Sequence, residues 1–300
     1  MKIAISGASG LIGSKLGDVL TQKGNAIFPL VRDKTEKPLT GIFWNPSTKD
    51  IQGERLEAMD AVIHLAGKPL DEERWTPKVK EAIYASRIEG TRLISETLAR
   101  LHSPPRLLIS ASATDYYAFS PTPVGEDDGK PGHGFVSEMC QAWESATEAA
   151  KKAGIRVVNI RIPSVLAKNG NSILAAFLPL YRVGLGPILG TGRQLMCFIA
   201  RDDLVRAVEH IMAHEELCGP VNVLTPEPVT NGEFAATLSR ILGKPRFLRV
   251  PGPVLRLAMG EVAEAVLEGD ASLRPVKLAA SGFVFLYPDL ESALRHELSM

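Results

Sequence analysis

Several features that would mark a particular class of protein are scarce in this chain of 300 residues. The 34 lysines and arginines balance 34 aspartates and glutamates, so nothing indicates a strongly basic nucleic-acid-binding face. No apolar run approaches the roughly 18 residues that cross a bilayer. The first residues read directly into a strand and lack the features of a signal peptide. We therefore expect neither a nucleic-acid partner nor a membrane partner.

Cysteine is also rare. Cys140, Cys197 and Cys218 are odd in number, far apart and without a CxxC motif, which argues against a disulfide scaffold and a zinc site. The histidines at positions 64, 102 and 133 show no metal-ligand spacing with another His, Cys or acid. We expect no metal ion, a reducing compartment and a cytoplasmic location.

What the chain does contain is a regular alternation of strands and helices. Hydrophobic residues make up 45% and charged residues 23%, as in a globular protein with a full core. The expected strands are 2–6, 26–31, 61–65, 106–110, 156–162 and 221–224, and the expected helices include 11–23, 78–101, 140–152, 202–214 and 231–242, the last capped by Asn231. This order predicts an α/β fold in which helices cover both faces of a parallel sheet.

A glycine motif lies between the first strand and the first helix. Gly7, Gly10 and Gly13 have the spacing that lets the backbone turn tightly, approach a pyrophosphate and pack the helix on the strand. The helix dipole then faces the phosphate, with Ser9, Leu11 and Ile12 completing the loop. The motif predicts a Rossmann fold that binds NAD(P), although a glycine-rich turn without a ligand has the same spacing.

The end of the second strand bears on the choice of cofactor. NAD-binding proteins place an acid about 20 residues after the glycine loop, and Arg32 stands near that place. A guanidinium can stack on adenine and hold a 2′-phosphate, so we predict NADP(H) over NAD(H). The alternative is that Arg32 is a surface residue and that Asp33 binds the ribose.

Further motifs resemble the extended short-chain dehydrogenases/reductases. The segment 60–67 (DAVIHLAG) resembles their fourth strand, and 110–117 (SASATDYY) resembles the segment with the catalytic Ser or Thr. The segments 86–91, 161–166 and 198–203 resemble the following helix, the strand end beside the nicotinamide, and the segment after the substrate loop. The resemblance implies cofactor contacts, or support of the cofactor loop, at Leu65, Ala66, Gly67, Arg87, Ser110 and Pro163.

The chain more narrowly resembles the YfcH-type, sugar-nucleotide-epimerase-related family of atypical short-chain dehydrogenases. Three features carry this likeness: the Arg74-Trp75 pair followed by Ser86-Arg87, the segment 184–192 (GLGPILGTG), and the tail segments 267–269 and 282–290. The likeness covers essentially the whole chain and implies a smaller C-terminal substrate lobe.

The superfamily's catalytic Tyr-x-x-x-Lys motif is missing from the whole chain. Val136 takes the tyrosine place and Cys140 the lysine place, and neither side chain can perform that acid–base chemistry. Ser112 matches the catalytic Ser, and Tyr116 and Tyr117 are candidate phenols on the same loop, although both rings could simply be wall residues. Cys140 is best interpreted as a small buried hydrophobe.

Two functional hypotheses follow. The first is an NADP(H)-dependent oxidoreductase or epimerase-like enzyme with a changed catalytic centre, acting on a small carbonyl or hydroxyl compound that could be nucleotide-linked. The second is a non-catalytic NADP(H)-binding regulator or interaction protein. We expect residues 1–165 to bind the cofactor, with the sheet completed by about 203–225. Residues 166–202 and 226–300 would form the substrate lobe, where Arg193 and Arg201 are possible anion contacts. A monomer or a homodimer fits the sequence equally well.

Overall fold

The computed structural model describes residues 1–32, 41–70, 73–245 and 248–299. One sheet of eight strands lies at its centre, in the order β12-β7-β6-β5-β1-β2-β3-β4. Its strands are β1 (Lys2–Ser6), β2 (Ala26–Val31), β3 (Ile42–Asn45), β4 (Asp50–Ile51), β5 (Ala61–His64), β6 (Leu107–Ala113), β7 (Arg156–Ile162) and β12 (Gly219–Asn222). Every pairing is parallel except β3 with β4.

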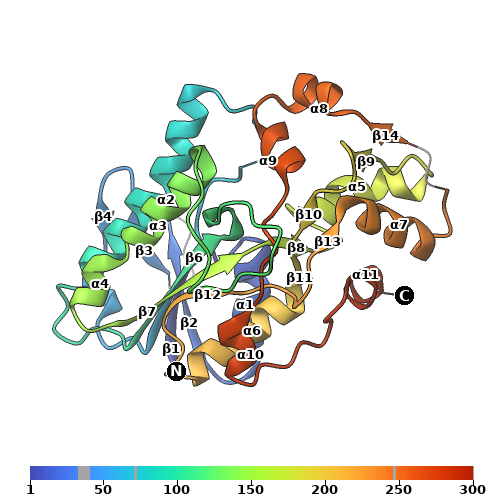
Figure 1. Ribbon diagram of the computed structural model, residues 1–300. Helices are drawn as coiled ribbons and strands as arrows, with labels where there is room; N and C mark the ends of the chain where they lie inside the picture. The colour runs from blue at the N-terminus through green and yellow to red at the C-terminus, as the bar shows by residue number, and fades with distance from the viewer. Residues whose placement is uncertain (33–40, 71–72, 246–247, 300) are drawn as a thin grey trace.

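Helices cover both faces of this sheet, as Figure 1 shows. The helices on one face are α2 (Pro77–Leu98), α3 (Phe135–Ser145) and α4 (Glu148–Lys152); those on the other are α1 (Leu11–Gln22), α6 (Arg201–Ala213) and α10 (Val276–Ala280). The apolar stripe of α1, with Leu16 and Leu20, meets Leu204 and Val208 of α6 in one buried cluster. The central strands form continuous apolar runs because helices cover both faces of this mostly parallel sheet. The predicted fold class is confirmed.

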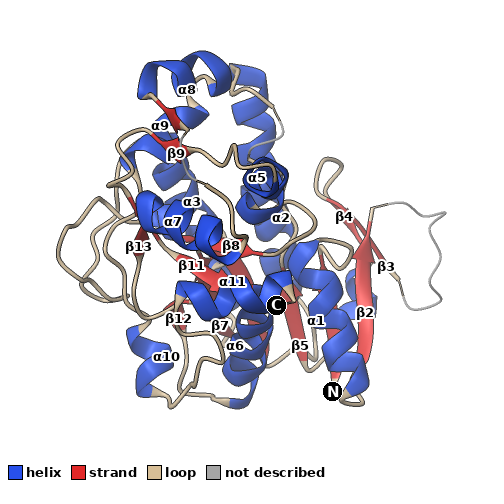
Figure 2. Ribbon diagram, turned by 90° about the vertical axis from the view of Figure 1, so that its right-hand side faces the viewer, coloured by secondary structure: helices blue, strands red, loops and turns tan. Residues whose placement is uncertain are grey.

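Most of the remaining elements gather beyond the carboxyl ends of the strands, at the upper right of Figure 1, and α11 lies lower on the right. They are β8 (Ser164–Leu166), α5 (Ile173–Arg182), β9 (Ile188–Leu189), β10 (Leu195–Met196), β11 (Phe198–Ala200), β13 (Val229–Thr230), α7 (Asn231–Ile241), β14 (Arg249–Val250), α8 (Gly252–Met259), α9 (Val262–Glu268) and α11 (Leu290–Leu298). In Figure 2, α8 and α9 lie at the opposite end of the molecule from the N-terminus. The division into a cofactor part and a substrate lobe stays a prediction.

Some expected elements were wrong in their limits. The helix expected over 140–152 is two helices. The first, α3, begins earlier, at Phe135, and ends at Ser145; the second, α4, begins at Glu148. The strand expected at 221–224 begins at Gly219 and ends at Asn222. Asn231 does not cap α7; Thr230 does, in a capping box with Glu233. Strands β3 and β4 were not predicted, since their short apolar runs lack a clear period.

Among the described residues, no helix combines the length and apolarity that crossing a membrane requires. The same residues contain no cluster of three or more His, Cys, Asp or Glu side chains suited to a metal ion. All three cysteines are free thiols, with Cys140 and Cys197 buried and Cys218 exposed.

Candidate functional site

The glycine loop between β1 and α1 has no room for side chains at two of its glycines. Gly7 has a φ of 70°, and a Cβ there would lie 2.9 Å from the carbonyl carbon of Leu65. A Cβ on Gly13 would lie 2.2 Å from the carbonyl oxygen of Gly7, so only glycine lets α1 sit this close to the loop. Gly10 begins the helix as its N-cap without a side-chain cap, and the first turn of α1 contains no acid. The positive end of α1 is therefore open to an anion.

A hydrogen-bonded floor under this loop joins β1 to β5. The Ser6 hydroxyl accepts hydrogen bonds from the backbone N–H groups of Leu65 (3.2 Å) and Ala66 (3.3 Å). The same hydroxyl bonds to His64 Nδ1 at 2.5 Å. Complete burial lowers the pKa of His64 to about 4, so the ring is neutral near pH 7. Sequence reasoning missed Ser6, although its place directly before Gly7 was a usable signal.

A hollow of about 860 Å³ opens beside the loop, between the end of β2, the β3–β4 turn and α2. It brings together Arg32, Ala66 and Gly67, three residues that the sequence assigned to the cofactor. Trp44 and Lys49 also line the hollow; the sequence analysis did not single them out, because β3 and β4 were not expected. Asp33, the alternative ribose ligand, lies outside the described residues.

Arg87 is buried behind the hollow rather than exposed in it. Its Nη1 donates to the carbonyl oxygen of Lys68 at 2.7 Å, and its guanidinium lies 5.1 Å from the ring of Trp143. Its Nε has no hydrogen-bond partner among the described residues. Ser86 Oγ accepts from the N–H of Lys68 at 3.0 Å. Arg87 and Ser86 thus hold the loop after β5, which fits the supporting role that the resemblance implied.

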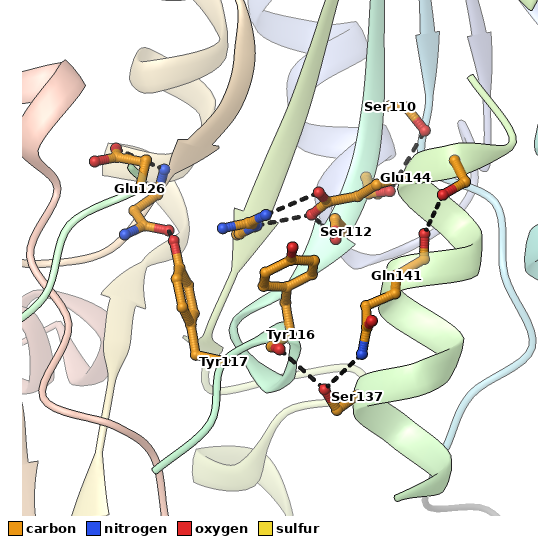
Figure 3. A network of polar contacts seen from close by, with 12 residues as sticks. Ser110, Ser112, Tyr116, Tyr117, Glu126, Ser137, Gln141 and Glu144 are labelled. Carbon is orange, nitrogen blue, oxygen red and sulfur yellow. Dashed lines mark hydrogen bonds and ion pairs between the residues drawn. The ribbon is translucent and has the colours of Figure 1, made fainter. Parts of the chain in front are cut away.

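Ser112, at the end of β6, belongs to a buried polar network (Figure 3). Its hydroxyl donates to Glu144 Oε1 at 2.8 Å. Arg161, on β7, donates from Nε to the same oxygen at 2.7 Å and from Nη2 to Oε2 at 2.8 Å. This is a two-bond pairing of guanidinium and carboxylate, with Arg161 only 3% exposed. The Ser112 hydroxyl is therefore committed to Glu144, and its catalytic role stays a prediction.

The two loop tyrosines differ in their freedom. The Arg161 guanidinium lies 3.5 Å from the ring centre of Tyr116 and 4.6 Å from that of Tyr117. The Tyr117 hydroxyl donates to Asn222 Oδ1 at 2.7 Å, and burial raises the pKa of Tyr117 to about 12. The Tyr116 hydroxyl makes no hydrogen bond within the described part of the chain, and its ring points toward the Ser112 end of the network (Figure 3). Catalysis by either tyrosine stays a prediction.

A second cavity, of about 640 Å³, lies between the residues that follow β6, the start of α3 and α9. Val136, in the superfamily's tyrosine place, lines it, whereas Cys140 is fully buried among apolar side chains. Burial raises the pKa of the Cys140 thiol, which therefore stays protonated, and its interpretation as a buried hydrophobe is confirmed. Neither Arg193 nor Arg201 is among the residues that line this cavity.

Two further residues that the sequence assigned to the cofactor, Ser110 and Pro163, lie outside the glycine loop and the hollow. Ser110 is fully buried within β6, paired in register with His64. Pro163 follows β7 directly, at the carboxyl edge of the sheet, and precedes β8. Their cofactor contacts stay predictions.

A family model described as the NAD dependent epimerase/dehydratase family matches residues 3–223. The chain belongs to this family. A second model, a domain of unknown function (DUF1731), matches residues 250–297 of the tail. The resemblance to an epimerase-related family of atypical short-chain dehydrogenases is confirmed, and family membership supports the binding of a nicotinamide dinucleotide.

Similar sequences and a similar solved structure are also described as epimerase family proteins. An epimerase family protein of Mycobacterium leprae is 35% identical over 295 residues, which cover 98% of this chain and 94% of the relative. The epimerase family protein YfhF of Bacillus subtilis is 34% identical, with 98% and 97% covered. The crystal structure of human epimerase family protein SDR39U1 with NADPH is 28% identical and has a TM-score of 0.91, covering 100% of this chain and 99% of that one.

Proposed function

We propose that this epimerase-family protein binds NADP(H) in preference to NAD(H). The glycine loop carries the proposal, because Gly7 and Gly13 exclude side chains where the N-terminus of α1 is open to an anion. Arg32 and Lys49 line the hollow beside the loop and supply positive charge for a 2′-phosphate. The crystal structure of human SDR39U1 with NADPH supports the same cofactor. The proposed contacts and loop supports are Gly7, Ser9, Gly10, Leu11, Ile12, Gly13, Arg32, Leu65, Ala66, Gly67, Arg87, Ser110 and Pro163.

The proposed reaction is oxidoreduction or epimerisation of a small carbonyl or hydroxyl compound in the cytoplasm, by a monomer or a homodimer. Bound NADP(H) would supply or accept the hydride. The chain would bind the substrate beside Val136, in the cavity at the start of α3. Ser112, Tyr116 and Tyr117 are the polar candidates beside the cofactor's reactive end, and the Glu144–Arg161 pair fixes their positions.

A second candidate function is NADP(H) binding without turnover, as a regulator or interaction protein. The observation that favours it is the replacement of the superfamily's Tyr and Lys by Val136 and the buried Cys140. Function depends on the site rather than on the fold, so cofactor binding alone does not decide between the two candidates.

The test of the cofactor proposal is Arg32→Ala, titrated with NADPH and with NADH. Hydrogen bonds to a charged group contribute about 1.5–3 kcal/mol. We therefore expect the NADPH dissociation constant to rise roughly tenfold or more, with NADH binding nearly unchanged. Arg100→Ala, at an exposed position after α2, is the matched control and should change neither affinity. An equal loss of NADPH and NADH affinity in Arg32→Ala would contradict the proposed 2′-phosphate contact.

A further inference from the structure

One acidic side chain at the end of β6 lines the same cavity as Val136, the residue in the place of the missing tyrosine. Asp115 follows Ser112 by three residues, in the short 3-10 turn Thr114–Tyr116 that comes directly after β6. Both Asp115 and Val136 line the 640 Å³ cavity. A substrate that contacts Val136, in the tyrosine place, therefore shares this cavity with the Asp115 carboxyl group.

We propose that Asp115 is the residue that exchanges a proton with the substrate's carbonyl or hydroxyl oxygen in this cavity. The inference rests on the proposed NADP(H)-dependent reaction and names the group that takes over the role of the absent tyrosine.

The contacts of the competing groups favour Asp115. The Tyr117 hydroxyl group already donates its hydrogen bond to Asn222. Glu261 is paired with Lys80, and Glu264 receives two hydrogen bonds from Arg256. The Asp115 carboxyl group, in contrast, receives a hydrogen bond only from its own backbone N–H among the described residues. Asp115 is therefore the acid at the end of β6 whose carboxyl oxygens can form hydrogen bonds with a ligand in the cavity.

The surroundings of Asp115 favour its protonated form. Burial raises its pKa, while Arg87, on α2, opposes this by lowering it. From α3 and from the segment before β11, the facing groups are the Cys140 and Cys197 thiols, which burial keeps protonated. From the loop after α9, the facing group is Asp270, whose own pKa burial raises to about 7. The shift of the Asp115 pKa is thus in the direction that a proton donor requires.

The step balances with NADP(H) as the redox partner. In the reducing direction, a hydride from the reduced nicotinamide forms a C–H bond at the carbonyl carbon, and the C=O π pair takes the proton of Asp115. The products are the alcohol, NADP⁺ and the Asp115 carboxylate, which regains a proton from water. In the oxidising direction, the Asp115 carboxylate accepts the hydroxyl proton as the hydride leaves.

The charges of the cavity narrow the substrate class. Among the residues that the structure describes, its lining includes Asp115, Asp270 and three glutamates of the 261–268 segment, with His133 as the one basic side chain and neither lysine nor arginine. Lys80 and Arg256 are already paired with Glu261 and Glu264, so the lining offers a diphosphate no free cationic partner among the described residues. Uncharged or amine-bearing carbonyl compounds fit better than a nucleotide sugar.

The first measurement is NADPH consumption with a panel of uncharged aldehydes and ketones and a matched set of phosphorylated aldehydes. The wild-type protein should reduce members of the uncharged set in preference. Asp115→Asn, which keeps the size of the side chain, should lower kcat by about 10²- to 10⁴-fold with a small change in KM. Asp115→Glu should recover part of the activity. Asp128→Asn, the same change at an exposed acid away from the cavity, should keep it.

The second measurement does not depend on turnover. Carbon NMR of the protein labelled at aspartate carboxyl carbons should show a group that titrates above the ordinary aspartate range and disappears in Asp115→Asn. In the same variant, the separate signal of Asp270 should titrate at a lower pH, because the Asp115 carboxylate that helps to raise the pKa of Asp270 is removed.

Three results would overturn the inference: an Asp115 carboxyl with an ordinary pKa, an active Asp115→Asn beside an inactive Tyr116→Phe, or a wild-type protein that binds NADPH but reduces no compound of the panel. Failure of the wild-type protein to bind NADPH would instead overturn the proposed function itself.

Discussion

The buried pair of Glu144 and Arg161 makes a quantitative prediction for Glu144→Ala. The Arg161 side chain is 3% exposed and lies against the rings of Tyr116 and Tyr117, so it cannot turn to water when its partner is removed. Its Nη1 already has no hydrogen-bond partner in the described part of the chain. Breaking a buried ion pair by removing one partner costs about 3–5 kcal/mol. At about 2 °C per kcal/mol for a chain of this size, we expect Tm to fall by about 6–10 °C.

The assay is urea and thermal unfolding followed by circular dichroism, with Glu144→Ala compared with the double variant Glu144→Leu/Arg161→Met. The double variant removes both charges and fills much of the same volume, so it should recover most of the lost free energy of unfolding. Ser112 loses its hydrogen-bond acceptor in both variants, so this loss does not contribute to the difference in their free energies of unfolding. A loss below about 1 kcal/mol in Glu144→Ala, typical of a solvent-exposed pair, would refute this reasoning.

Two further predictions concern the glycine loop and its floor. Gly13→Ala should weaken NADPH binding at least roughly tenfold in a calorimetric titration, because its Cβ would lie 2.2 Å from the Gly7 carbonyl oxygen. The control is Gly17→Ala, on the same helix with open space around it, which should bind NADPH normally. Similar losses of affinity in both variants would contradict the packing argument. The free energy of unfolding should fall by up to about 3 kcal/mol as the pH drops from 6.5 to 4. The reason is that His64 has a folded-state pKa of about 4, below its unfolded value of 6.5, so only the unfolded state gains a proton in this window. In urea unfolding between pH 6.5 and 4, the free energy of unfolding of His64→Asn should depend less on pH than that of the wild-type protein. The same pH dependence in both proteins would show that His64 is not the cause.

The sequence was most informative where one residue type has one physical reason to be present. Gly7 and Gly13 were predicted because a turn with positive φ and a close helix–strand contact tolerate no other residue. The apolar strands β1, β5 and β7 were predicted because strands buried on both faces form short continuous apolar runs. The absence of Tyr-x-x-x-Lys could be read directly, and the structure places Val136 and Cys140 in α3, as that reading required.

The contacts that join distant segments could not be predicted. Ser6 meets His64 across 58 residues, and Tyr117 meets Asn222 across 105 residues, with no local pattern that couples them. The role of Glu144 as the shared acceptor of Ser112 and Arg161 depends on the register of β6 with β7. The acidic cavity depends likewise on how α9 packs over the start of α3, which no spacing in the sequence encodes.

Cofactor binding itself is best tested by a calorimetric titration of the unmodified protein with NADPH and with NADH, supported by nicotinamide fluorescence. We expect saturable binding of NADPH at one site per chain, with clearly weaker binding of NADH. Binding of neither dinucleotide would contradict this expectation and would leave the glycine loop as a structural turn.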